Sequence, residues 1–239
     1  MKIGIIAAME EELSRLVDSI GHYREIQFGQ FKYYTSEVDG VEVALFLCGI
    51  GKVNASVGTT LLIDKLKPDC LINTGVAGGV QDNIQIGDIV VSSEVRHHDA
   101  DATAFDYEFG QIPSMPPAFT ADERLVTMAR HVTMNDPTVR IHYGPVVSGD
   151  SFIHDANQVE RITERFPSTM AVEMEGAAIA QTSYLFGIPF VLIRSISDRV
   201  QEDGSSTTYT QCMEQAAENS VGMVLGMIDN LREENTWKR

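Results

Sequence analysis

The chain has 239 residues, of which 44% are hydrophobic, and a formal net charge of −16. This length and apolar content suffice for one buried core, so we expect a single domain over residues 1–239. The negative charge disfavours nucleic acid and anionic membranes as partners, and no apolar run approaches the roughly 20 residues that span a bilayer. A small neutral or cationic ligand fits this charge.

Short apolar runs alternate with helical patterns along the chain. The pattern predicts strands at 2–7, 25–38, 41–48, 69–74, 88–96, 139–147 and 189–197, with a turn at Asp39–Gly40. It predicts helices at 9–20, 53–66, 121–133, 155–166, 171–186 and 208–233, and irregular backbone at 97–119. Buried strands separated by helices are typical of an α/β fold, here a three-layer α/β/α sandwich around a mixed, largely parallel twisted sheet.

The cysteines and the N-terminal stretch bear on the cellular compartment. Cys48, Cys70 and Cys212 are odd in number and lie in or beside apolar runs, which suits reduced thiols better than a disulfide framework. The apolar stretch 3–9 is followed by glutamates at 10–12, the opposite charge order to a secretory signal. We therefore expect a cytoplasmic protein without a targeting segment.

The segment 171–186 predicts a helix with a carboxylate on its apolar face. At 3.6 residues per turn, that face holds Glu175 together with Ala178, Ile179, Thr182, Leu185 and Phe186. Glu173 falls on the opposite face, where we expect it to sit in water. A carboxylate that faces the core is costly unless something binds it. Glu175 is therefore either a functional ligand or a buried glutamate satisfied by an arginine or by backbone amides.

Other polar residues and glycines follow the ends of predicted strands, where open α/β sheets bind ligands. Arg194 and Asp198 point to the same side of their strand by the two-residue period, as part of a site or as a structural ion pair. The run TGVAGG (74–79) permits tight turns and close backbone approach to a ligand. The run CGIGK (48–52) precedes a helix but lacks a full phosphate-loop or dinucleotide fingerprint, so we assign neither.

The remaining candidates lie at two helix starts. The glutamates at 10–12 favour the helix dipole, and helical phase directs Glu11 away from the core but does not choose between Glu10 and Glu12. Asp155 is a candidate cap for the helix that follows it. Phe152 is either a core residue or a platform for a flat ring.

Metal binding and nucleophilic side-chain catalysis are weakly supported. His97, His98, Asp99 and Asp101 lie close in sequence, but adjacent side chains point apart and no cysteine spacing accompanies them. We therefore expect no metal site. The chain also has no local signature of a serine or cysteine nucleophile.

Segments spread over nearly the whole chain carry a resemblance to a known family. They are MKIGIIAAMEEE (1–12), CGIGKVNA (48–55), INTGVAGG (72–79), 87–113, VSGDSFI (147–153), AVEMEGAAIA (171–180) and RSISD (194–198). In this order they resemble the nucleoside phosphorylase and hydrolase superfamily, above all the bacterial 5′-methylthioadenosine/S-adenosylhomocysteine nucleosidases. The resemblance implies hydrolysis of the bond between adenine and a 5′-thio-substituted ribose, with 5′-deoxyadenosine as a further candidate substrate, in methionine salvage and methyl-cycle by-product recycling. It implies no metal or organic cofactor.

The resemblance also implies a role for each central residue. Asp198 would be the general acid that protonates adenine N7, and Glu12 would be the base for the attacking water, which chooses between the two open glutamates. Glu175 and the Met174 backbone would hold the ribose hydroxyls. Arg194 would help to position Glu175 and the water.

Further substrate-binding residues implied by the resemblance are Met9, Gly78, Phe152, Ile153, Ser197 and Tyr209. Phe152 would stack on adenine, while the Ile153 main chain would read its Watson–Crick edge. Met9 would lie against the sugar, Gly78 near the water, and Tyr209 against the 5′ substituent. Phe105 and Pro113 would line the 5′-thio pocket of a neighbouring subunit, so a homodimer is implied.

Two positions depart from the family pattern, and three other functions compete. Val76 stands where a hydroxyl residue is common, and Ala102 where a larger aliphatic residue is common. A phosphorylase would bring a phosphate dianion beside Glu12, which is repulsive, so water is the favoured nucleophile. The motifs do not separate a methylthio substrate from aminodeoxyfutalosine. A non-catalytic binding protein should have lost Glu12, Glu175 or Asp198.

Overall fold

The computed structural model describes residues 1–38, 40–199 and 205–233, and only the backbone for 205–211, 232 and 233. The strands are Lys2–Ala7 (β1), Arg24–Phe28 (β2), Phe31–Val38 (β3), Val41–Leu47 (β4), Cys70–Gly79 (β5), Ile89–His97 (β6), Phe119–Thr120 (β7), Ile141–Ser148 (β8), Ala171–Glu173 (β9) and Phe190–Arg199 (β10). The helices are Glu10–Ile20 (α1), Lys52–Leu66 (α2), Glu123–Arg130 (α3), Ala156–Arg165 (α4), Gly176–Phe186 (α5) and Ser205–Glu233 (α6), with a 3₁₀ turn at Thr103–Phe105 (η1).

The strands join into one mixed sheet that partly closes on itself. β5 pairs with β10 on one side and with β9 on the other, and β6 and β8 complete a ring between them. β1, β4, β3 and β2 extend outward from β5. The predicted α/β class and mixed sheet are confirmed, whereas the ring was not predicted. Because β1 and β10 both pair with β5 in parallel, the carboxyl ends of these three strands lie close together.

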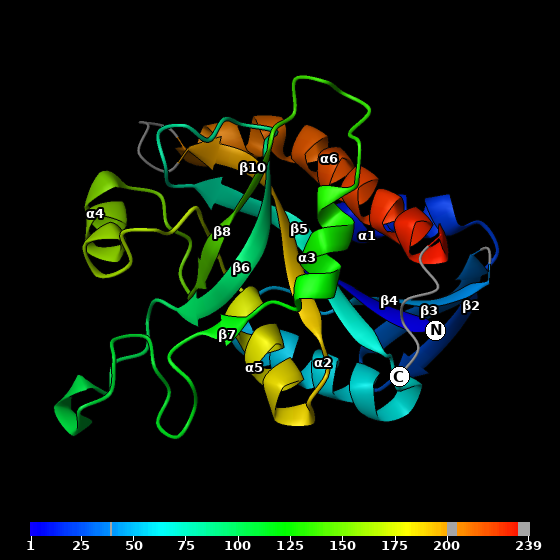
Figure 1. The fold of residues 1–239 in the computed structure, drawn as a ribbon, viewed down its shortest axis with the longest axis horizontal. Helices are drawn as coiled ribbons and strands as arrows, with labels where there is room; N and C mark the ends of the chain where they lie inside the picture. The colour runs from blue at the N-terminus through cyan, green and yellow to red at the C-terminus, as the bar shows by residue number, and fades with distance from the viewer. Residues whose placement is uncertain (39, 200–204, 234–239) are drawn as a thin grey trace.

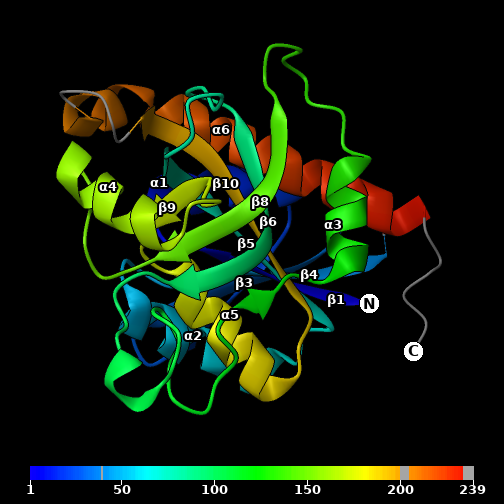
Figure 2. The same cartoon turned by 60° about the vertical axis from the view of Figure 1, so that its left-hand side comes forward.

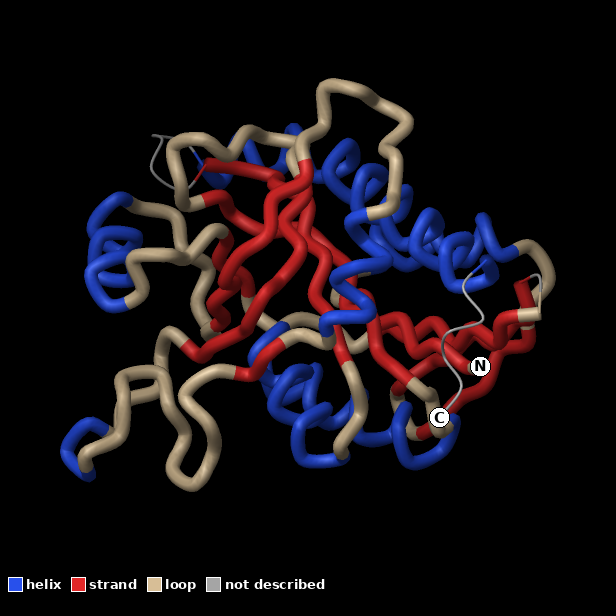
Figure 3. The backbone as a smooth tube through the Cα atoms, viewed as in Figure 1, coloured by secondary structure: helices blue, strands red, loops and turns tan. Residues whose placement is uncertain are grey.

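Helices cover both faces of the sheet (Figures 1 and 3). One face carries α1, α3 and α6, whose apolar residues share a core with β1, β5 and β10. The other face carries α2 and α5, which pack against each other. Helix α6 lies along one face of the sheet, packed against β10 and β5 (Figure 2). Among the described residues, no helix is long and apolar enough to cross a lipid bilayer.

Three local predictions are wrong in instructive ways. The single strand expected at 25–38 is a hairpin of β2 and β3, because the chain turns at Gly29 with φ of 60°. The glycine run 74–79 is not a turn but the continuation of β5, held by pairing with β10 over its whole length. Residues 171–173 form strand β9, not helix, since they pair with both β5 and β8. Asp39 lies outside the described residues.

Candidate active site

A cavity opens where β1, β5, β9 and β10 end. Most of the predicted substrate residues line it, namely Met9, Glu12, Gly78, Phe152, Ile153, Met174, Glu175, Ser197 and Asp198. The chain reaches this cavity from six separated segments, which belong to or follow strands of the closed part of the sheet and of its β1–β4 extension. Four residues with carboxyl side chains therefore line one space, namely Glu12 of α1, Glu173 of β9, Glu175 at the start of α5 and Asp198 of β10.

Glu12 is fixed at the floor of the cavity by backbone donors. Its Oε2 accepts hydrogen bonds from the N–H groups of Ala8 at 2.9 Å and Met9 at 3.1 Å. Its Oε1 accepts one from the N–H of Val76 at 3.1 Å. Burial raises the pKa of Glu12, although the Arg194 charge and these three donors act against it. Glu10 is exposed, so of the two glutamates left open by helical phase only Glu12 reaches the cavity.

The backbone of β5 approaches Glu12 so closely that glycine is needed at position 75. A Cβ placed on Gly75 would lie 2.8 Å from Glu12 Oε1, closer than nonbonded contacts allow. Ser220 of α6 also holds the backbone at this position, because its Oγ accepts a hydrogen bond from the Gly75 N–H at 3.1 Å. The glycine therefore allows the backbone to approach a side chain of the same chain, whereas we predicted an approach to a ligand.

Glu175 lies at the start of α5 and not on a helix face. It is the residue that precedes the first helical residue, Gly176, and its Oε1 accepts a hydrogen bond from the Gly51 N–H at 2.8 Å. Burial and the Glu173 charge raise the pKa of Glu175 to about 8, while the Gly51 donor and Arg194 lower it. The predicted inward face is also wrong at its far end, since Leu185 and Phe186 are exposed.

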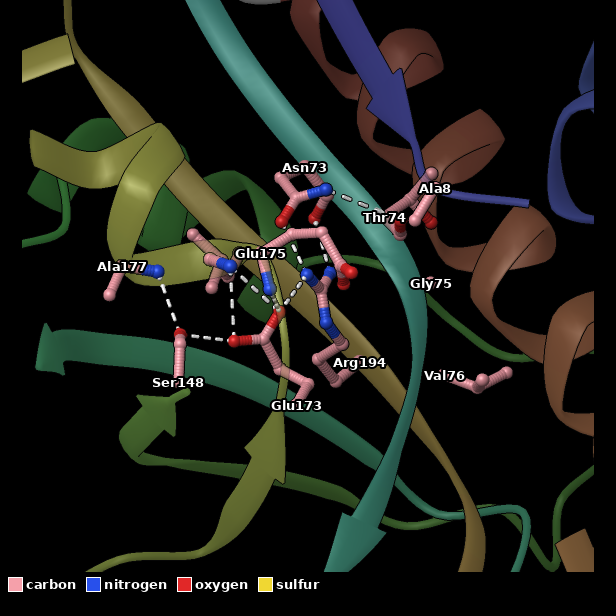
Figure 4. Close-up of polar contacts among 12 residues, drawn as sticks. Ala8, Asn73, Thr74, Gly75, Val76, Ser148, Glu173, Glu175, Ala177 and Arg194 are labelled. Atoms are coloured by element: carbon pink, nitrogen blue, oxygen red, sulfur yellow. Dashed lines mark hydrogen bonds and ion pairs between the residues drawn. The ribbon is translucent and has the colours of Figure 1, made fainter. Parts of the chain in front are cut away.

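Glu173, which we expected in water, is instead a buried member of the site. Its exposed fraction is 8%, and Arg194 donates to its Oε2 at 2.7 Å. Ser148 donates to Oε1, and the N–H groups of Glu175 and Gly176 also donate to the carboxylate (Figure 4). The helical phase that predicted exposure does not apply, because position 173 belongs to β9.

Arg194 is buried and contacts Glu175 only through an intermediary. Its guanidinium donates to Glu173, to the side-chain oxygen of Asn73 and to the Asn73 and Ile193 carbonyls. Among the described residues, its hydrogen bonds reach Glu173 and not Glu175. Any positioning of Glu175 by hydrogen bonds from Arg194 would therefore have to run through Glu173.

Asp198 presents one oxygen to a neighbour and leaves the other unpaired. Ser197 Oγ donates to Oδ1 at 2.8 Å, whereas Oδ2 is buried and has no partner among the described residues. Burial raises the pKa of Asp198, and the Ser197 hydrogen bond lowers it only in part. The pairing of β10 with β5 shifts register between Ile196 and Asp198, so two consecutive side chains, Ser197 and Asp198, line the cavity. The strict two-residue period that we assumed breaks there.

The loop after β8 supplies the aromatic wall. Phe152 lines the cavity and is 43% exposed, with its ring stacked at 6.4 Å on His154, and Ile153 beside it is buried. Asp155 caps α4 as predicted, since its carboxylate accepts the Gln158 N–H at 3.0 Å. A flat, accessible ring at the cavity favours the platform interpretation of Phe152 over the core interpretation.

Known proteins resemble this chain in both sequence and structure. A family model described as the phosphorylase superfamily matches residues 2–229. A 5′-methylthioadenosine/S-adenosylhomocysteine nucleosidase of Maridesulfovibrio salexigens is 65% identical over 97% of this chain and 100% of its own. The crystal structure of such a nucleosidase from Colwellia psychrerythraea with adenine has a TM-score of 0.94 and 40% identity, covering 97% of this chain and 96% of that one. Another, from Neisseria meningitidis with methylthio-immucillin-A, has a TM-score of 0.92 and 39% identity, covering 95% and 98%.

The chain belongs to the 5′-methylthioadenosine/S-adenosylhomocysteine nucleosidase family of the phosphorylase superfamily. The predicted resemblance is thereby confirmed. Within this nucleosidase family fold, Phe105 and Pro113 lie away from the cavity of their own chain, and both are exposed. The segment that carries η1 projects from the body of the molecule (Figure 1). The side chain of Tyr209 lies outside the described residues.

Sequence reasoning missed the polar residues behind the cavity. Asn73 and Ser148 are buried beside the Glu173–Arg194 pair, and the asparagine inside the apolar run CLINT was a signal that we did not use. Two of the candidate metal residues make other contacts, since Asp99 pairs with Lys52 at 2.6 Å and His97 bonds Gln181. In the described part of the chain, no three or more His, Cys, Asp or Glu side chains are grouped to hold a metal.

Proposed function

We propose that this chain hydrolyses the N-glycosidic bond of 5′-methylthioadenosine and S-adenosylhomocysteine, releasing adenine and the thioribose, with 5′-deoxyadenosine as a further substrate. The observation that carries the proposal is the convergence of Glu12, Glu175 and Asp198 on one cavity beside the exposed ring of Phe152. We further propose that residues 1–239 act as one catalytic domain and that the reaction uses water and no cofactor.

Asp198 is the general acid of the proposed reaction. As the bond between ribose C1′ and adenine N9 breaks, its electron pair moves into adenine, and N7 takes the proton of Asp198. Burial raises the pKa of Asp198, which favours the protonated form that the acid role requires. Proton transfer of this kind contributes about 10²–10⁴ in rate. Oδ2, which has no partner among the described residues, is the oxygen suited to donate it.

Glu12 is the base of the proposed reaction. Loss of adenine leaves an electron-poor, oxocarbenium-like sugar, which water attacks at C1′ while Glu12 accepts its proton. The three backbone donors hold the carboxylate in one orientation, so it needs no hydroxyl at position 76 to be placed. The negative carboxylates around the sugar also stabilise its developing positive charge.

The remaining contacts bind the two halves of the substrate. Glu175 and the Met174 backbone hold the ribose hydroxyls, with Met9 against the sugar. The contacts to the base and to the rest of the pocket come from Gly78, Phe152, Ile153, Ser197 and Tyr209. Stacking of an aromatic ring on a flat purine is favourable, but it does not distinguish the polar groups on the edge of the purine. Recognition of adenine therefore depends on the Ile153 main chain.

A homodimer completes the proposal. Large apolar side chains are exposed side by side on α2 and α5, where Val53, Val57 and Leu185 line a common groove. Burying such a surface against a second copy is favourable, and it would carry Phe105 and Pro113 to the neighbouring cavity. Sedimentation of the full chain tests the dimer, and Phe105→Ala should raise KM for thio-nucleosides while the dimer persists.

The proposed role is methionine salvage and recycling of a methyl-cycle by-product in the cytoplasm. The free thiols of Cys48, Cys70 and Cys212 support a reducing compartment. The experiment that tests the function is adenine release from 5′-methylthioadenosine with and without phosphate, followed by a panel of 5′ substituents that includes aminodeoxyfutalosine. Release that depends on phosphate would replace the proposal by a phosphorylase.

A further inference from the structure

Glu173 anchors Glu175, the residue proposed to bind the ribose, to the interior of the protein. Its carboxylate accepts the N–H of Glu175 at 3.1 Å and the N–H of Gly176 at 3.0 Å and 2.8 Å, which fixes the chain where α5 begins. Ser148 donates to Glu173 and accepts the Ala177 N–H at 2.7 Å, so the same anchor extends into the first turn of the helix (Figure 4). A shift of Glu173 would move Glu175 with it.

Glu173 also forms an ion pair with Arg194, whose positive charge acts on Glu175. Arg194, buried with 2% exposure, donates to Glu173 Oε2 at 2.7 Å and also to Asn73 and to the Ile193 carbonyl. Burial acts to raise the pKa of Glu173, but Arg194 and the hydrogen bonds outweigh it and hold that pKa below its usual range. Glu173 is therefore the ionised partner of the guanidinium.

Other groups that face Glu175 do not replace that charge. Glu12 adds a further carboxylate, and the buried thiol of Cys48 stays neutral because burial raises its pKa well above the usual value. The Gly51 N–H supplies one hydrogen bond at 2.8 Å. The cluster thus holds one guanidinium for three carboxyl groups.

We propose that Glu173 is a positioning residue which, by engaging Arg194 and the start of α5, leaves Glu175 without a cationic partner, so that its carboxyl group is available to the ribose hydroxyls and the cationic sugar. This inference rests on the proposed function. Its consequence is a coupling between substrate binding and proton release. With its pKa raised to about 8, Glu175 carries a proton at pH 7 in the free protein. Ribose hydroxyls that donate to it favour the ionised form, so binding expels that proton into solvent.

The test is the number of protons released on binding a 7-deaza analogue of 5′-methylthioadenosine. Carbon at position 7 cannot accept a proton, so the analogue removes the proton transfer from Asp198 to adenine N7 from the measurement. Calorimetry at pH 7 in two buffers with different ionisation enthalpies gives the proton count directly. We expect release of most of one proton per site from the wild type and release near zero from Glu173→Gln, because that change removes the repelling charge and frees Arg194 for Glu175.

Two further variants separate charge from packing. Ser148→Ala weakens the same network but keeps the charge of Glu173, so it should release as much proton as the wild type. Glu173→Asp keeps the charge on a shorter arm, so it should retain proton release while kcat falls. Thermal unfolding of each variant shows whether the fold persists.

The outcomes distinguish this inference from the proposed function. Equal proton release by the wild type and by a folded Glu173→Gln variant would overturn the inference. A wild type that binds the analogue without releasing a proton would also overturn it, and that result needs no variant. Adenine release from 5′-methylthioadenosine by the same wild-type sample reports separately on the proposed function. Hydrolysis without the proton signature would leave the function standing and remove only the role of Glu173.

Discussion

Replacing Asp198 by asparagine removes a proton donor while nearly preserving the shape of the side chain. Asp198 is 2% exposed, and Ser197 Oγ donates to its Oδ1 at 2.8 Å, a bond that an amide oxygen can also accept. The amide nitrogen that replaces Oδ2 can donate a hydrogen bond to adenine N7 but cannot transfer a proton to it. The variant should therefore bind the nucleoside and fail to cleave it.

The expected loss follows from the size of general acid catalysis. That term contributes about 10²–10⁴ in rate, or about 2.7–5.4 kcal/mol at about 1.36 kcal/mol per factor of ten. We expect kcat of Asp198→Asn to fall within this range, with KM changed less than about threefold because binding is shared by the ground and transition states. Adenine release, followed by absorbance, measures both parameters.

Stability against pH provides the control for folding. Burial raises the pKa of Asp198 in the folded protein, so its stabilising contribution is present below the unfolded pKa of about 3.9 and is lost as pH rises through the folded pKa. Asp198→Asn should therefore be at least as stable as the wild type at pH 7, and relatively less so in acid. A folded variant with kcat within about threefold of the wild type would refute the acid assignment.

Three other substitutions test the rest of the cavity. Glu12→Gln should lower kcat by about 10²–10⁴ and abolish the fall in wild-type kcat as pH drops through the raised pKa of Glu12; an unchanged pH–rate profile would move the base elsewhere. Gly75→Ala places a Cβ 2.8 Å from Glu12 Oε1 and should displace that carboxylate, at about 10²-fold in kcat, whereas a variant with normal turnover would show that the contact relaxes freely. Glu175→Ala should raise KM about 10–100-fold and lower turnover, since hydrogen bonds to charged groups contribute about 1.5–3 kcal/mol; if thermal unfolding shows that it mainly unfolds the protein, Glu175 has a structural role instead.

The sequence predicted the apolar strands and helices well because their patterns are local. The strands at 2–7 and 41–48 are buried runs, and α2 and α4 begin within a residue of the expected positions. What pattern alone could not predict is pairing at a distance. β5 continues through its glycines because β10 lies beside it, and the ring forms because β9 reaches both β5 and β8.

The same limit explains the outcome for the site. Helical phase left Glu10 and Glu12 equivalent, and only the resemblance chose Glu12, whose three backbone donors come from the residues after β1 and from β5. Phase failed for Glu173 because residues 171–173 form a strand that precedes helix α5, so the helical period does not apply to them. Partners such as Asn73 and Ser148 are remote in sequence, so their contacts with the Glu173–Arg194 pair become visible only in three dimensions.

The measurement that tests the central claim most directly is adenine release from 5′-methylthioadenosine by the wild-type protein, with phosphate absent and then present. Water attack assisted by Glu12 predicts the same rate in both conditions and free methylthioribose as the second product. Release that requires phosphate, with a ribose phosphate as product, would contradict hydrolysis and the role of Glu12. No release in either condition would contradict the assignment of the three carboxyls to this chemistry.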